Sequence, residues 1–110
     1  MTTVEINAGI CGFTTMVHAE KTDGYNAMFR LESQCPNWQK VNDLLGGQEM
    51  DLMTELFKNR QTGEFDSILL ETFLQAIPHI SCPVISGIFK ALEVSAGLAL
   101  PRDAAICFRE

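Results

Sequence analysis

The chain has 110 residues, 46% of them hydrophobic, which is enough for one domain with one core and too few for two. Its net charge of −6 and its eight scattered basic residues argue against a nucleic-acid-binding surface, since such surfaces need clustered Lys and Arg. No apolar run approaches the roughly 20 residues of a membrane-spanning helix, and the N-terminus has neither the basic nor the apolar part of a secretory signal. We therefore expect one cytoplasmic domain over residues 1–110, with no nucleic-acid or membrane partner, whose four cysteines are thiols or metal ligands rather than disulfides.

The first third of the chain predicts three strands. Residues alternate with the period of a half-buried strand over Thr2–Ala8, Phe13–Lys21 and Ala27–Ser33. The faces that gather the apolar residues carry Val4, Ile6 and Ala8, then Phe13, Thr15, Val17 and Ala19, then Ala27, Phe29 and Leu31. Two glycines around Cys11 predict a sharp turn after the first strand, and Asp23-Gly24 predicts a hairpin turn after the second.

Four helices and a last strand are expected after these strands. Apolar residues at helical spacing predict helices over Pro36–Leu45, Met50–Lys58 and Ser67–Ala76, and a fourth from Cys82 or Pro83 to a stop at Gly97. Asp66 is the expected N-cap of the third helix, and Ala104–Arg109 is expected to return as a strand that completes the sheet. The residues expected to face inward from the first three helices are Val41, Leu44, Leu45, Leu52, Met53, Leu56, Phe57, Ile68, Leu69, Phe73 and Leu74, with Trp38 at an edge.

This order of elements predicts the fold class. Strands cluster at the N-terminus and helices follow as a run, which favours segregated layers over a parallel sheet with crossover helices. We expect an α+β domain in which a three- or four-stranded, mostly antiparallel sheet carries helices on one face.

The start of the fourth predicted helix carries a cysteine in a position that favours a reactive thiolate. Proline is favoured at a first helical position, so Pro83 places Cys82 where free N–H groups and the positive end of the helix dipole favour a thiolate. A thiolate is the form of cysteine that acts as a nucleophile or a metal ligand. Cys35-Pro36 repeats this arrangement at the start of the first helix.

Three cysteines, Cys11, Cys35 and Cys82, lie at the ends of predicted elements, from which side chains can converge. The chain has no C-x-x-C pair, so the local zinc-ribbon and finger patterns are absent. Either these cysteines share one metal or cluster site, with His79 beside Cys82 as a fourth ligand, or they are packing residues, as free cysteines often are. Cys107, on the expected last strand, is predicted to be structural.

The order of these features resembles the iron-sulfur cluster assembly scaffold family of the IscU and NifU N-terminal type. Cys11-Gly12, Asp23-Gly24, Cys35 and Cys82 follow one another at comparable separations, and Ser81-Cys82-Pro83 resembles part of the signature of the related TSCPD domain. The resemblance implies an IscU-like fold in which Cys11, Cys35 and Cys82 converge on a labile cluster or a zinc ion. The chain departs from the scaffold at Phe13, where the family has Asp, at Ser81, where it has His, and at Pro36, where it has Gly. The G-I-C-G-F and C-P-V blocks also give a closer likeness to an uncharacterised family of small proteins, which implies no function.

The sequence is compatible with three alternative functions. The first is a metal- or iron-sulfur-binding domain that uses Cys11, Cys35, Cys82 and His79 and has no turnover of its own. The second is a protein-interaction module that binds another protein or a second copy of itself, with Met28, Trp38, Met50 and Met53 as candidates for exposed apolar surface. The third is a thiol enzyme with Cys82 as the nucleophile, for which no orienting partner beyond His79 can be named.

Overall fold

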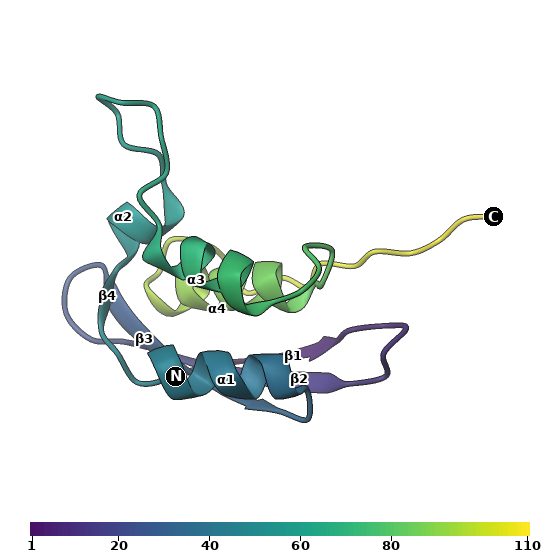
Figure 1. Ribbon diagram of the computed structural model, residues 1–110. Helices are drawn as coiled ribbons and strands as arrows, with labels where there is room; N and C mark the ends of the chain where they lie inside the picture. Colours follow the sequence, from purple (N-terminus) through teal and green to yellow (C-terminus); the bar gives the residue numbers. More distant parts are fainter.

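The structure, a computed structural model, describes residues 1–110 and confirms the α+β class. In chain order its elements are β1 (Thr2–Asn7), β2 (Thr14–Lys21), β3 (Asn26–Ser33), α1 (Pro36–Leu45), β4 (Met50–Asp51), α2 (Leu52–Leu56), α3 (Ile68–Ala76) and α4 (Val84–Ser95). The four strands form one antiparallel sheet in the order β1-β2-β3-β4. Figure 1 shows the helices in a layer over one face of this sheet.

The register of the sheet explains which strand residues are buried. Val4 pairs with Val17, and Val17 pairs in turn with Leu31, so residues of one parity share a face on all three long strands. The helix layer covers this face, and Ile6, Thr15, Val17, Ala19, Ala27, Phe29 and Leu31 are buried there, as the alternation predicted. The other face is polar, with His18 Nε2 lying 2.9 Å from Glu32 Oε1.

Trp38 lies at the centre of the core rather than at its edge. Its side chain is 1% exposed, and its ring meets that of Phe73 edge to face at a centroid distance of 5.3 Å. Phe73 stacks in the same way on Phe89 of α4 at 5.6 Å. Edge-to-face aromatic pairs of this kind add about 0.5–1.5 kcal/mol beyond the area they bury. These three rings therefore join α1, α3 and α4 above the sheet.

Helix α4 packs most closely on the sheet at Gly87. This glycine is buried, and a Cβ atom built on it would overlap Ile6 Cδ1 of β1. The helix ends at Ser95, and Gly97, the predicted stop, has a φ of +77°, which suits glycine. The Leu98 N–H donates to the Glu93 carbonyl and the Gly97 N–H to the Val94 carbonyl, the two bonds of a Schellman motif.

The structure corrects several predicted boundaries. Ala104–Arg109 forms no strand, because residues 99–110 leave the body as an exposed segment without regular structure. Met50 and Asp51 belong to β4, and the short α2 begins after Asp51, whose side chain caps it by accepting from the Met53 N–H. The N-cap of α3 is Ser67 rather than Asp66, and α4 begins at Val84.

Burial on the helices also differs from expectation, because each helix has one stripe in the core and further apolar residues outside it. Leu69 and Phe73 of α3 are buried as predicted. The predicted inward residues that are exposed instead are Leu44, Met53, Phe57, Ile68 and Leu74.

Candidate functional site

Cys82 lies beside the core, with its sulfur turned to an indole. Its side chain is partly buried against the core cluster, and Trp38 Nε1 donates a hydrogen bond to Cys82 Sγ at 3.4 Å. The N-cap position of α4 is Pro83, and no side chain there bonds to a helix N–H group. The interaction of Cys82 with Trp38, 44 residues away, was not predictable from either local sequence.

Cys35 is the second cysteine in contact with the core. It occupies the N-cap position of α1, and its backbone N–H donates to Ser33 Oγ at 3.1 Å. Its side chain makes no capping hydrogen bond and packs, like Cys82, against the edge of the core cluster.

The other predicted ligands lie elsewhere on the surface. Cys11 is exposed in the turn between β1 and β2, and His79 is exposed in the segment before α4. Nowhere do three or more His, Cys, Asp or Glu side chains come together as a group that could hold a metal ion. The structure thus places Cys35 and Cys82 against the core, whereas Cys11 and His79 are exposed on the surface. Cys107, expected on a strand, is exposed in the C-terminal segment.

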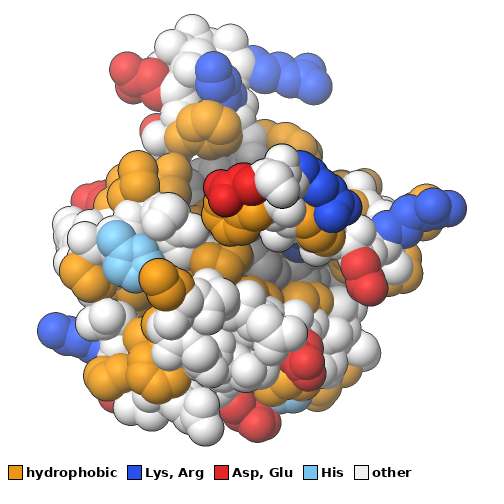
Figure 2. Space-filling view, turned by 90° about the vertical axis from the view of Figure 1, so that its right-hand side faces the viewer, with side chains coloured by type: hydrophobic (Ala, Val, Ile, Leu, Met, Phe, Trp, Pro, Cys, Tyr) orange, Lys and Arg blue, Asp and Glu red, His pale blue; other side chains and the backbone are white.

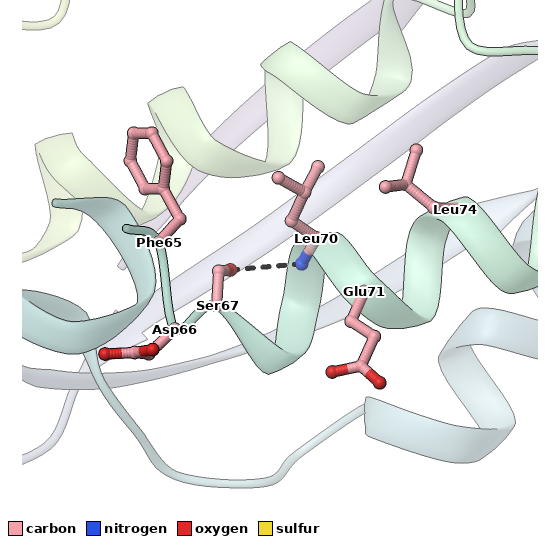
Figure 3. Close-up of a pocket in the computed structure, with 6 residues that line it drawn as sticks. All are labelled: Phe65, Asp66, Ser67, Leu70, Glu71 and Leu74. Atoms are coloured by element: carbon pink, nitrogen blue, oxygen red, sulfur yellow. Dashed lines mark hydrogen bonds between the residues drawn. The ribbon is translucent and has the colours of Figure 1, made fainter. Parts of the chain in front are cut away.

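One concave surface of the molecule lies along α3. An open hollow of about 460 Å³ is lined by Phe65, Asp66, Ser67, Leu70, Glu71 and Leu74. Figure 3 shows Phe65, Leu70 and Leu74 pointing to one side of the α3 axis, and Asp66 and Glu71 pointing to the other. A second hollow, of about 210 Å³, shares Phe65, Ser67 and Leu70 and reaches α4 at Phe89 and Glu93. We call these two adjoining hollows the α3 groove.

Glu55 fixes the end of α3 that borders the groove. This carboxylate is 8% exposed, and it accepts hydrogen bonds from Ser67 Oγ at 3.2 Å, the Ile68 N–H at 3.3 Å and the Leu69 N–H at 2.8 Å. Ser67 Oγ in turn accepts from the Leu70 N–H at 3.1 Å. The first N–H groups of a helix lack intrahelical partners and carry a partial positive charge, so a carboxylate is a favourable cap. Sequence reasoning missed this role, because Glu55 lies in a different helix from the groups it caps.

The groove combines apolar side chains with negative charge. Phe65 and Leu74 are 53% and 54% exposed. The two hollows are lined by four carboxylate side chains, those of Glu55, Asp66, Glu71 and Glu93, and by no Lys or Arg. Lys58 lies outside this lining, and its Nζ is 5.7 Å from the centroid of the Phe65 ring. A ligand that suits this surface is therefore apolar and positively charged.

No helix of the structure has the length and the apolar character needed to cross a membrane.

Comparison with known proteins gives a family and no activity. Neither the search of curated proteins nor that of solved structures found a match. One family model matches residues 2–108, almost the whole chain, including most of the exposed C-terminal segment. The chain therefore belongs to a family of unknown function, DUF6951.

Proposed function

We propose that this protein is an interaction module whose α3 groove binds an amphipathic segment of a partner protein, one that carries apolar residues beside basic ones. The observation that carries the proposal is the pair of half-exposed side chains, Phe65 and Leu74, in a hollow lined only by carboxylates among charged groups. Exposed apolar surface of this kind is typical of binding sites, since leaving it in water is unfavourable.

The shape of the groove supports a peptide rather than a small substrate. The larger hollow is open to solvent, whereas small-molecule sites enclose most of their ligand. An amphipathic helix or strand would place apolar side chains against Phe65, Leu70 and Leu74 and basic ones near Asp66 and Glu71. The hydrogen bonds from Ser67, Ile68 and Leu69 to Glu55 hold the start of α3 in place beside this surface.

The test uses a synthetic amphipathic peptide of alternating Leu and Lys as the probe. We expect titration calorimetry to show binding that weakens with added salt, because surface charges are screened within about 10 Å at 0.1 M salt. The variants Leu74→Ser and Phe65→Ser should each weaken binding about fivefold or more, since loss of a buried apolar contact is worth about 1–3 kcal/mol.

Leu44→Ser is the matched control, because Leu44 is also half-exposed but lies on α1 and lines neither hollow. Equal affinities for the groove variants and this control would refute the proposal. A peptide with Glu in place of Lys should bind weakly or not at all.

A further inference from the structure

The C-terminal segment, residues 99–110, carries large apolar side chains, forms no helix or strand, and is exposed throughout. Leu100, Ile106 and Phe108 are 75%, 85% and 86% exposed, and the backbone bonds within the segment are limited to one from the Arg102 N–H to the Leu100 carbonyl. Figure 1 shows the segment running away from the body, and Figure 2, from the side it projects to, shows hydrophobic side chains around a hollow on this face. Three large apolar residues exposed together on one short segment mark a candidate interaction site.

The sheet offers an open edge of matching length. Strand β1 pairs with β2 on one side and has no strand on its other side, so one row of its backbone N–H and C=O groups has no ladder partner. Its six residues, T-T-V-E-I-N, include four β-branched ones and no Pro or Lys, the residues that commonly protect an edge from further pairing. The other edge strand, β4, has only two residues.

The segment itself has the pattern of a strand that would fit this edge. Ala104, Ile106 and Phe108 alternate with Ala105, Cys107 and Arg109, and the six residues equal β1 in length. If the first set faces the helix layer beside Val4 and Ile6, its apolar side chains extend the core, and the second set faces solvent with Thr3 and Glu5. Glu5 would then lie on the same face as Arg109, which gives this pairing a complementary charge.

We propose that Ala104–Arg109 of one copy adds as a fifth strand to the β1 edge of a second copy, and that the exchange is reciprocal. The direction of the segment favours a second copy, because the C-terminal segment runs away from its own sheet. Each copy has one long free edge and one free segment, so a reciprocal exchange closes a two-fold dimer that uses both. This interface is separate from the α3 groove and does not depend on the function proposed for it.

The oligomeric state tests the proposal through paired variants of the segment. We expect sedimentation velocity to show a dimer for the full chain. Ile106→Lys with Phe108→Lys should give a monomer, since these side chains would enter the core of the partner. Ala105→Lys with Cys107→Lys is the matched control, and it should stay dimeric because it places the same charges on the solvent face. A monomeric full chain, or equal behaviour of the two double variants, would overturn the proposal.

Disulfide trapping tests which edge is used and whether the strand crosses between copies. In a Cys11→Ser background, Glu5→Cys or Thr3→Cys should form an interchain disulfide with the natural Cys107 on oxidation, because opposite residues of paired strands approach closely enough for one. Glu20→Cys, exposed on the inner strand β2, should form none. An intrachain disulfide alone would show that the segment pairs with its own sheet, and equal trapping at Glu20→Cys would show random contact. The groove variants Phe65→Ser and Leu74→Ser should remain dimeric, so the two proposals fail independently.

Discussion

Glu55 stabilises the fold by accepting three hydrogen bonds at the start of α3. Glu55→Ala leaves the N–H groups of Ile68 and Leu69 and the hydroxyl of Ser67 without their acceptor, and two of these groups are buried. An unsatisfied buried polar group costs about 1–3 kcal/mol, so we expect the free energy of unfolding to fall by that order. Urea denaturation followed by circular dichroism measures the loss. Glu64→Ala, in the exposed loop before α3, should change it little, and equal losses would contradict the capping role.

Metal or cluster binding by the cysteines stays a prediction. Metal or cluster binding by Cys11, Cys35, Cys82 and His79 would require rearrangement, because these side chains form no group able to hold a metal here. If such binding occurs, anaerobically purified protein contains zinc or iron by elemental analysis, Cys82→Ser loses it, and Cys107→Ser keeps it. Protein that is free of metal and takes up none on reconstitution would leave Cys35 and Cys82 as packing residues. Such a result would not affect the groove or the proposed dimer.

Among the elements, α4 lies close against β1 at Gly87. A methyl group at position 87 would overlap Ile6, so Gly87→Ala should destabilise the fold by about 1–3 kcal/mol, although Ala is usually better than Gly within a helix. The urea midpoint measures this effect. Ser86→Ala, at the adjacent exposed position, should be neutral or stabilising. Ile6→Val, which removes the overlapping Cδ1 atom, should recover part of the loss when combined with Gly87→Ala, and an absence of recovery would contradict the steric explanation.

The elements also show what the sequence could and could not predict. The alternation in β2 and β3 correctly identified Val17, Ala19 and Phe29 as buried, because a sheet covered on one face imposes that period directly. Helix α3 was predicted to bury Ile68 and Leu74 as well as Leu69 and Phe73, since apolar residues alone do not say how wide a stripe the neighbouring elements cover. Leu74, one of these exposed apolar residues, lines the α3 groove.

The predicted C-terminal strand does not form within the chain, and the reason differs from that for the helices. The alternation of Ala104–Arg109 is real, yet these residues form no strand within the chain, because a strand requires an edge to pair with and a pattern does not specify whose edge that is. A related limit applies to the predicted metal ligands, among which the structure shows no group of three or more. Their positions at the ends of elements are local properties, whereas their separation depends on how α1 and α4 are placed on the sheet.

At the scale of the whole molecule, one compact body and one projecting segment account for the dimensions. The radius of gyration is 13.8 Å, slightly above the roughly 13 Å typical of a compact domain of this length, and the longest extent is 41 Å against 30 Å for the other two. The core cluster joins the sheet to all four helices. The body should therefore unfold as one unit.

The contact between Trp38 and Cys82 gives the molecule a built-in optical reporter. Trp38 is the single tryptophan of the chain, it is buried, and its indole N–H donates to a thiol sulfur, a group that quenches indole emission. The folded protein should therefore emit weakly and at short wavelength, and unfolding should make its emission stronger and shift it to the red. Oxidation or alkylation of Cys82 would alter the intensity without unfolding the sheet, so one fluorescence measurement distinguishes chemistry at this thiol from loss of the fold.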